Sequence, residues 1–586
     1  MNKKLSLTRK YRTYTCNEIS EVDINKKVKL SGWVHRVRDH GGIIFADLRD
    51  QFGITQIVIT EELAEKLNRE TVVFFEGKVV KRDEETLNPK IKTGMVEVLA
   101  EKMEILGQAK RTLPFLPDES LTVNEEVRLK YRYLDLRNNK VLSNMLLRTE
   151  IIKTIRANMD ALNFTEIQTP ILANSSPEGA RDYLIPSRLH KGKFYALPQA
   201  PQQFKQLLMV AGFDRYYQIA PCFRDEDARK DRSPGEFYQL DFEMAFATEE
   251  DVFKIAETVL SNTFKTFTNK EITNTPFPIF SYKDVILKYG TDKPDLRNPL
   301  EIINLTDFFR EVDFKPFKNS PVRGIVVPNA AKKPRSFFRD MEKFAFSIGM
   351  KGLGYITVLE DGSYKGPIDK FMNSDQKLKI KKITSLKKDD VLYFISAKEA
   401  DVSIFAGKIL TEVAKRMDII DRDKFAFCFI NDFPMYEKNE ESGEIDFLHN
   451  PFSMPKGEME SLLNKNPLEI IAEQYDIVCN GVELSSGAVR NHKPEVMKKA
   501  FELAGYSEDI LKEKFSALYE AFSYGAPPHA GMAPGIDRIV MLLSGEENIR
   551  EIIPFPLNQN AVNPMLCCPS EVSEKQLREI HIKIRS

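Results

Sequence analysis

Three stretches of the 586-residue sequence combine charged, aromatic and glycine residues at spacings that could support chemistry. The first is "FRDEDARKDRSPGEFYQLDFE", residues 223–243, where arginines and acids lead into a turn at "SPGE" and a strand follows. Side chains alternate in direction along a strand. One face of this strand therefore carries Phe237, Gln239, Asp241 and Glu243. A ring, an amide and two carboxylates on one face predict that this face meets a polar partner.

The second stretch is "GAPPHAGMAPGIDRIVMLL", residues 525–543. Its glycines permit close backbone approach, and a helix is expected to begin near Gly535, where free N–H groups and the helix dipole favour an anion. Arg538 falls in the first turn, where a cation opposes the dipole unless a phosphate is bound. The pattern predicts a phosphate site, and a glycine-rich turn before an ordinary helix is the alternative.

Two further segments supply polar side chains. In "YDIVCNGVELSSGAVR", residues 475–490, Asp476 and Glu483 are possible magnesium ligands, because magnesium takes carboxylates together with substrate phosphates. Each acid alone could equally be structural. Residues 176–183 and 196–209 place Glu178 on a loop and Gln202 and Lys205 in the first turns of a helix, which fits an active-site lid or a surface loop.

Several common sites are missing from the sequence. It contains neither GxxxxGK[ST] nor a GxGxxG after a strand, so side chains must hold any nucleotide. The six cysteines form no CxxC and the seven histidines form no HExxH, which argues against a transition-metal site.

Composition indicates a soluble multidomain protein, with 42% hydrophobic and 29% charged residues. No apolar run approaches the roughly 20 residues that span a bilayer, and the N-terminus lacks the features of a secretory signal. We therefore expect a cytoplasmic protein without a membrane segment. The net charge of −1 hides a basic region, since residues 1–45 hold ten lysines and arginines against four acids.

Residues 28–106 contain five short β-like runs with a helix-like "ELAEKLN" between the third and the fourth. This pattern favours a small Greek-key barrel of the OB type, and any other five-stranded barrel is the alternative. Arg36, Arg38, Phe45 and Arg49 interleave on the first two runs, as in proteins that bind single-stranded RNA. Phe45 alone could equally be a core residue.

The remaining segments suggest a two-part domain around an insertion. An amphipathic helix over 142–163 precedes the strand-like "FTEIQTPIL", in which Pro170 fits an edge or an interface. We expect the following ranges: a barrel domain over 1–110, a linker over 111–141, a catalytic domain over 142–290 and 421–558, an insertion over 291–420 and a C-terminal extension over 559–586.

In this order, the segments resemble the class II aminoacyl-tRNA synthetases, and within them the bacterial-type aspartyl-tRNA synthetases. Helix 142–163 with Pro170 resembles motif 1 of the class, "FRDEDARKDRSPGEF" resembles motif 2 and "GMAPGIDR" resembles motif 3. The resemblance implies a multidomain α+β protein with an OB-fold barrel, an antiparallel-sheet catalytic domain, and an inserted α/β domain between motifs 2 and 3. Ser233 and Gly235 depart from the usual motif 2 turn.

The resemblance also implies roles for individual side chains. Arg224 would bridge the substrate α-carboxylate and the ATP α-phosphate, Phe237 would stack on adenine, and Arg538 would clamp the γ-phosphate, while Asp476 and Glu483 would hold Mg²⁺. The implied ATP site also includes Asp225, Glu226, Gly535, Ile536 and Asp537. Lys205 and Arg490 would pair with the aspartate side-chain carboxylate, so that a neutral asparagine would leave both cations uncompensated. The ammonium group would be served by Glu178, Gln202, Asp241 and His449.

For the barrel, the resemblance implies that Phe45 and Gln56 meet the anticodon, with Arg36 on its backbone. His40 stands where relaxed members of the family carry histidine and discriminating members carry leucine, which suggests charging of both tRNA-Asp and tRNA-Asn. The family also implies a homodimer. Two other functions stay open: a catalytically idle RNA-binding protein on a synthetase scaffold, and an ATP-dependent enzyme similar to asparagine synthetases.

Overall fold

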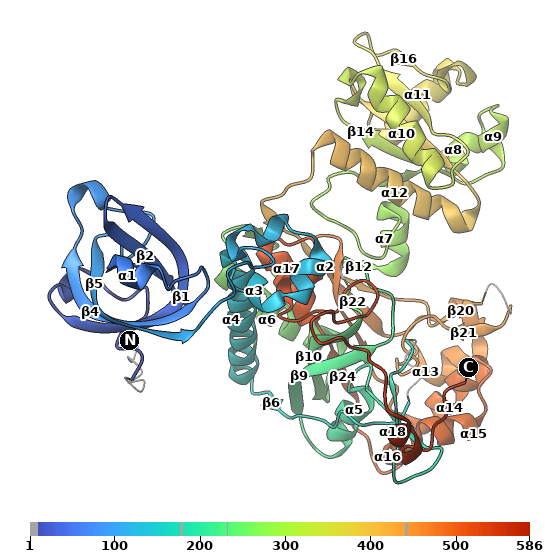
Figure 1. Ribbon diagram of the computed structural model, residues 1–586. Helices are drawn as coiled ribbons and strands as arrows, with labels where there is room; N and C mark the ends of the chain where they lie inside the picture. Colours follow the sequence, from blue (N-terminus) through green and yellow to red (C-terminus); the bar gives the residue numbers. More distant parts are fainter. Residues whose placement is uncertain (1–9, 176–179, 231, 440–442, 586) are drawn as a thin grey trace. The chain divides into compact units, whose positions relative to one another are not determined.

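The computed structural model describes residues 10–175, 180–230, 232–439 and 443–585 (Figure 1). The chain divides into two compact units, Met1–Ser143 with Pro564–Leu566, and Asn144–Asn563 with Cys567–Ser586. Each unit has its own hydrophobic core and is described by itself.

The first unit contains a closed five-stranded barrel in the order β1-β2-β3-β5-β4. Its elements are β1 (Lys27–His40), β2 (Ile43–Arg49), β3 (Ile54–Ile59), α1 (Glu61–Ala64), β4 (Val72–Lys81) and β5 (Val96–Gly107). β3 and β5 pair in parallel and the other neighbours pair antiparallel. Inward side chains such as Leu30, Leu48 and Phe75 fill the interior. The five-stranded barrel expected from the sequence is confirmed.

One glycine lets two of the barrel strands approach closely. Gly77 stands at an irregularity in the pairing of β4 with β5, and a Cβ there would lie 2.1 Å from the carbonyl oxygen of Leu99. Any larger residue would push the strands apart at this bend.

Three short helices follow the barrel where the sequence suggested a linker: η3 (Pro117–Thr122), α2 (Glu125–Lys130) and α3 (Arg132–Asp135). The buried carboxylate of Asp135 accepts hydrogen bonds from Arg128, with Nε 3.1 Å from Oδ1, and from Arg132. These ion pairs explain why a polar sequence is ordered here, because a paired buried carboxylate fixes the local backbone.

The second unit is built on an eight-stranded sheet in the order β12-β19-β22-β23-β24-β10-β9-β6. The strands are β6 (Thr165–Glu166), β9 (Arg215–Arg224), β10 (Gly235–Ala245), β12 (Ile279–Ser281), β19 (Phe427–Asn431), β22 (Gln474–Cys479), β23 (Val482–Val489) and β24 (His529–Met532). The six central strands pair antiparallel, and β12 and β6 add in parallel at the two edges. Only Thr165–Glu166 of the strand-like 164–172 is paired in the sheet, so most of that segment is irregular.

Three helices cover one face of this sheet: α4 (Asn139–Ala161), α6 (Glu249–Phe267) and α17 (Ile536–Ser544), all labelled in Figure 1. The alternate residues Leu240, Phe242 and Met244 of β10 point into the core that these helices close. Within it, the ring of Phe253 on α6 stacks on Phe429 with centroids 3.9 Å apart. The odd-numbered residues of β10 therefore face the opposite side, as the sequence predicted.

The insertion carries a separate five-stranded sheet in the order β13-β14-β17-β15-β16. The strands are β13 (Ile302–Asn304), β14 (Val322–Val327), β15 (Gly354–Val358), β16 (Tyr364–Lys365) and β17 (Val391–Ser396). Helices α10 (Arg335–Ser347) and α12 (Glu399–Met417) pack on one face, whereas α8 (Thr306–Arg310), α9 (Lys315–Lys318) and α11 (Ser374–Thr384) pack on the other. Every neighbouring pair is antiparallel, so the segment is α+β rather than the α/β type that the resemblance implied.

Shorter elements complete the second unit: α5 (Gln202–Val210), α7 (Tyr282–Tyr289), α13 (Glu458–Asn464), α14 (Pro494–Leu503), α15 (Glu508–Lys514), α16 (Ser516–Phe522), α18 (Glu574–Glu579) and strand pairs β7 (Leu184–Pro186) with β8 (Phe194–Ala196), β11 (Glu271–Ile272) with β18 (Lys424–Phe425), and β20 (Tyr436–Lys438) with β21 (Ile445–Phe447). Among the described residues, no helix combines the length and the apolar character needed to cross a membrane.

Candidate active site

A cavity of about 470 Å³ opens on the face of β10 that carries its polar residues. Its walls come from β10, from the start of α5, from β23 and from the N-terminus of α17. Twelve residues predicted from the sequence line it: Gln202, Lys205, Arg224, Glu226, Phe237, Asp241, His449, Glu483, Arg490, Gly535, Asp537 and Arg538. Segments that lie far apart in the chain are thus brought to one place.

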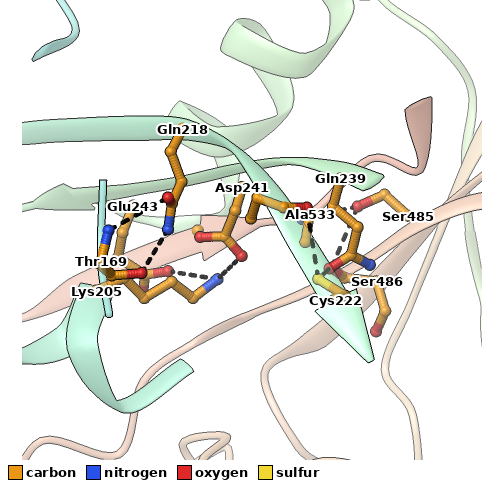
Figure 2. A network of polar contacts seen from close by, with 12 residues as sticks. Thr169, Lys205, Gln218, Cys222, Gln239, Asp241, Glu243, Ser485, Ser486 and Ala533 are labelled. Atoms are coloured by element: carbon orange, nitrogen blue, oxygen red, sulfur yellow. Dashed lines mark hydrogen bonds and ion pairs between the residues drawn. The ribbon is translucent and has the colours of Figure 1, made fainter. Parts of the chain in front are cut away.

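Four buried charges form the base of this cavity. Figure 2 shows the ammonium of Lys205 between Asp241 and Glu243, 3.1 Å from Oδ2 of the first and 3.3 Å from Oε2 of the second. The guanidinium of Arg490 donates two hydrogen bonds to Glu243, from Nε at 2.7 Å and from Nη2 at 3.1 Å. Because all four side chains are almost fully buried, the ion pairs must compensate for lost hydration.

Glu243 was missing from the site residues predicted by the sequence, although it shares a strand face with Asp241. Its position corrects one expectation, since Lys205 and Arg490 are already compensated before any ligand binds. Burial raises the pKa of a carboxyl group, but for Glu243 the charges of Arg490 and Lys205 outweigh burial and the pKa is lowered. The pKa of Asp241 is raised, chiefly by burial and only partly offset by Lys205.

Several buried polar atoms lining this cavity have no hydrogen-bond partner within the described part of the chain. The donors are Arg490 Nη1, Gln202 Nε2 and Arg224 Nε, and the acceptor is Oδ1 of Asp241. Buried polar groups are normally satisfied, so unpaired atoms around a cavity indicate a ligand that pairs with them. That ligand must offer acceptors to two guanidinium groups and a donor to a carboxylate.

The motif 2 hairpin, β9 with β10, supplies the next layer. The guanidinium carbon of Arg224 lies 5.0 Å from the ring centroid of Phe237, at the end of the hairpin where Arg224 pairs with Gly235. Gly235 has φ +87°, and a Cβ there would lie 3.1 Å from Leu557 Cδ1, so this departure from the usual turn requires glycine. Glu226 accepts a hydrogen bond from Arg232 at 2.5 Å.

The glycine-rich stretch before α17 is held to β23 by backbone and side-chain hydrogen bonds. Gly535 donates to the carbonyl of Leu484 at 2.8 Å and caps α17. The hydroxyl of Ser485 accepts a hydrogen bond from the N–H of Ala533 at 3.0 Å (Figure 2). Arg538 is held by the carbonyl oxygen of Glu483, 2.6 Å from Nη1. The first turn of α17 is therefore fixed at the cavity wall.

Asp476 and Glu483 are the candidate magnesium ligands. Burial, and then the negative charge of Glu483, raise the pKa of Asp476 well above its ordinary range, and Oδ1 of Asp476 has no hydrogen-bond partner among the described residues. Two carboxylates that repel each other, one with an unpaired oxygen, fit a divalent cation. No cluster of three or more metal-binding side chains occurs in the described ranges, so substrate oxygens would have to complete the coordination.

Two predicted ATP-site residues, Asp225 and Ile536, do not line the cavity, and a third, Asp537, lines it with its carboxylate already engaged. Asp225 is exposed, and the side chain of Ile536 lies in the hydrophobic core. The carboxylate of Asp537 is occupied by Arg148 and by the N–H of Tyr238 at 3.0 Å, so it anchors α17 to α4 and β10. Glu178 lies outside the described residues.

On the barrel of the first unit, the predicted RNA-contacting residues differ in exposure. Arg36 and His40 are exposed, and the ring of His40 meets Phe45 edge-on with centroids 5.8 Å apart. Gln56 is buried, accepts a hydrogen bond from Arg38 at 3.1 Å and donates one to Glu97 at 2.7 Å. Its amide is therefore held in one orientation.

Comparison with known proteins identifies the family. Residues 124–559 match the model for "tRNA synthetases class II (D, K and N)", and residues 28–106 match the model for an OB-fold nucleic acid binding domain. The chain belongs to the class II aminoacyl-tRNA synthetases. The resemblance read from the three motifs is confirmed.

Curated relatives agree over the full length. Proteins named "Aspartate--tRNA(Asp/Asn) ligase" from Rickettsia bellii and Rickettsia conorii are each 54% identical over 98% of both chains, and the one from Rickettsia prowazekii is 53% identical over 98% of this chain and 97% of its own.

Solved structures share the fold of this class II synthetase. An asparaginyl-tRNA synthetase from Pyrococcus horikoshii complexed with asparaginyl-adenylate has a TM-score of 0.57 at 20% identity, covering 93% of this chain and 97% of its own. A putative aspartyl-tRNA synthetase from Leishmania major has a TM-score of 0.58 at 20% identity and covers 95% of both chains.

His529 predicts how stability depends on pH. This fully buried side chain contacts Pro527 O at 2.8 Å and Gln206 Oε1 at 3.2 Å, and burial lowers its pKa to about 4 from an ordinary 6.5. Between pH 6.5 and 4, His529 is protonated in the unfolded chain and remains neutral in the folded chain. The free energy of unfolding should therefore fall by about 1.4 kcal/mol per pH unit as pH drops through this window, from this group alone.

Urea denaturation of the intact protein and of His529→Gln at several pH values checks this expectation. The difference between the two unfolding free energies should be constant above pH 6.5 and should shrink below it, because glutamine does not titrate. If the unfolding free energies of the wild type and of His529→Gln changed with pH in parallel, His529 would not control the loss of stability at low pH.

Proposed function

We propose that this synthetase activates L-aspartate with ATP and transfers it to tRNA-Asp and tRNA-Asn. The observation that carries the proposal is the buried cluster of Lys205, Asp241, Glu243 and Arg490, with unpaired atoms that match an amino acid bearing a second carboxylate. The names of the Rickettsia relatives support the same substrate and both tRNAs. As a translation enzyme of this kind, the protein would work in the cytoplasm.

In this proposal, Arg490 receives the side-chain carboxylate of aspartate on its unpaired Nη1, with Lys205 beside it. Asparagine would present an NH₂ group toward cations that can only donate, so one contact would become a donor–donor clash. Discrimination thus arises from the lack of an acceptor and does not require uncompensated cations. Oδ1 of Asp241 would accept a hydrogen bond from the α-ammonium, with Gln202 and His449 around it.

ATP would bind against the hairpin and α17. Phe237 would stack on the adenine, Glu226 would meet its edge, and the N–H groups of the first turn of α17, after Gly535, would face the phosphates. Arg224 would contact the α-phosphate and Arg538 the γ-phosphate. Asp476 and Glu483 would hold Mg²⁺ together with phosphate oxygens, and the ion would neutralise phosphate charge.

The chemistry then needs positioning more than proton transfer. The α-carboxylate oxygen attacks the α-phosphorus in line, a new O–P bond forms, and the bond to pyrophosphate breaks. Arg224 bridges the two reacting groups, and no general base is needed because the carboxylate is already ionised. In the second step, the 3′-terminal hydroxyl of tRNA attacks the activated carbonyl and AMP leaves.

Aspartate-dependent ATP–pyrophosphate exchange tests the proposal. The protein should exchange with aspartate and not with asparagine, and Arg490→Lys should raise the KM for aspartate by about 10- to 100-fold while the KM for ATP stays unchanged. Lysine cannot reproduce the bidentate bond to Glu243 and also reach a ligand. Glu236→Gln, on the exposed face of β10, is the matched control.

Other outcomes of this assay identify the competing functions. No exchange with any amino acid would favour an idle RNA-binding protein. Exchange without charging of tRNA would favour an enzyme similar to asparagine synthetases.

His40 gives a second prediction, on tRNA choice. The wild-type protein should aspartylate purified tRNA-Asp and tRNA-Asn, and His40→Leu should lower kcat/KM for tRNA-Asn more than for tRNA-Asp. His40 is exposed beside Phe45 on the barrel, so the change should not disturb the core. Charging of tRNA-Asp alone by the wild type would contradict the dual specificity.

We further propose a homodimer. α4 exposes Leu146, and the segment after β6 exposes Ile171 and Leu172, apolar side chains that a two-fold interface would cover. Sedimentation velocity should give about twice the 67.3 kDa chain mass, and Ile171→Asp combined with Leu172→Asp should shift it toward the monomer. Leu189→Asp, at another exposed leucine, is the control. A wild-type monomer at micromolar concentration would refute the dimer.

A further inference from the structure

Glu483 joins two cations at the rim of the cavity. Its Oε1 lies 3.6 Å from Nη1 of Arg538, and its Oε2 lies 3.3 Å from Nζ of Lys293. Lys293 belongs to the segment that leads from α7 into the insertion, a region without any cluster of catalytic residue types in the sequence. The start of the insertion therefore places one positive charge beside the candidate active site.

The position of Lys293 is fixed by its surroundings. Its ammonium donates to Oδ2 of Asp292 at 2.7 Å, and its N–H donates to Oγ1 of Thr291 at 3.1 Å. The same segment packs on the turn between β22 and β23, because a Cβ on Gly481 would lie 3.4 Å from Cβ of Asp295 and 3.8 Å from the carbonyl oxygen of Lys293. Lys293 is thus held beside the strands that carry Asp476 and Glu483.

The local charge balance explains why a cation is needed there. Asp292, Asp476 and Glu483 bring three carboxylates into one small region, and Lys293 acts electrostatically on all three and on His449, which lines the cavity. Its side chain is only 38% exposed, so water screens these interactions in part. Without ligands, Lys293 and Arg538 share the carboxylate of Glu483.

We propose that Lys293 binds the β- and γ-phosphates of ATP and the pyrophosphate leaving group. This inference rests on the proposed roles of Glu483 in holding Mg²⁺ and of Arg538 in binding phosphate. When the oxygens of Glu483 turn to a metal ion, both cations lose an acceptor. The polyphosphate supplies new acceptors at the same place, and an ammonium with three donors on a flexible stem can follow it.

The proposal has a specific signature. In the proposed function Arg224 would contact the α-phosphate, which stays with the amino acid, whereas Lys293 would contact only the part that leaves. Removing the charge of Lys293 should weaken the binding of ligands that carry the β- and γ-phosphates. It should leave the binding of the adenylate unchanged. A lysine that merely shapes the pocket would affect both kinds of ligand.

Calorimetric titration of the full-length protein tests this signature. Lys293→Met should bind ATP with Mg²⁺, and inorganic pyrophosphate with Mg²⁺, about 10- to 100-fold more weakly, the range expected for one charge-assisted hydrogen bond. Its affinity for a non-hydrolysable aspartyl-adenylate analogue should remain unchanged, and Lys293→Arg should recover most of the ATP affinity. Lys288→Met, at an exposed lysine on α7, is the matched control and should behave as wild type.

Two results would overturn the inference. One is that Lys293→Met binds ATP and pyrophosphate as tightly as the wild type does. The other is that its affinity for the adenylate analogue falls as much as its affinity for ATP. Glu483→Gln separates this failure from that of the underlying site. If Glu483→Gln leaves Mg²⁺-dependent ATP binding intact, the proposed metal role is wrong. If Glu483→Gln weakens ATP binding and Lys293→Met does not, only the proposed role of Lys293 is wrong.

Discussion

The bidentate ion pair between Arg490 and Glu243 is the interaction on which the rest of the site depends. It joins the end of β23 to β10, two strands separated in the sheet by β24. It also fixes Arg490 while its Nη1 has no hydrogen-bond partner among the residues that the structure describes. Lys205 extends the pair to Asp241. Because the two cations and two anions pair with each other, the desolvation free energy of burying them is largely offset. Their remaining donors and one acceptor stay available to a ligand. Preorganised polarity of this kind selects a ligand by its pattern of donors and acceptors.

The fold serves this arrangement by sorting one strand into two faces. Leu240, Phe242 and Met244 of β10 pack under α4, α6 and α17, whereas Phe237, Gln239 and Asp241 line the cavity. Asp537 then ties α17 to the same strand through the N–H of Tyr238 and to α4 through Arg148. Core packing and site geometry are therefore coupled, because a shift of β10 that disturbed its core residues would also move the ligand-binding groups.

Much of this could be predicted from sequence, because alternation along β10, the strand pattern of the barrel and the three class motifs are local signals. What could not be predicted depends on contacts between distant segments. The role of Glu243 depends on its bidentate partner Arg490, which follows in the chain only after the insertion. Asp537 has the sequence context of a ligand-binding acid, but its carboxylate pairs with Arg148, which lies 389 residues earlier in the chain. Lys293 carried no local signal at all, since a single lysine in an inserted segment is unremarkable without the spatial position of Glu483.

The interruption of the catalytic sheet by the insertion has a consequence for synthesis of the chain. β10 emerges from the ribosome long before its partner strand β24, with which it pairs through Phe242 of β10 and Met532 of β24. During that interval one side of β10 has no strand to bond with, and unpaired strand edges favour association between chains. The insertion has its own two core layers and can fold in the meantime. Slow translation or crowding of nascent chains would therefore threaten the catalytic half of this protein more than its barrel, whose strands all emerge together.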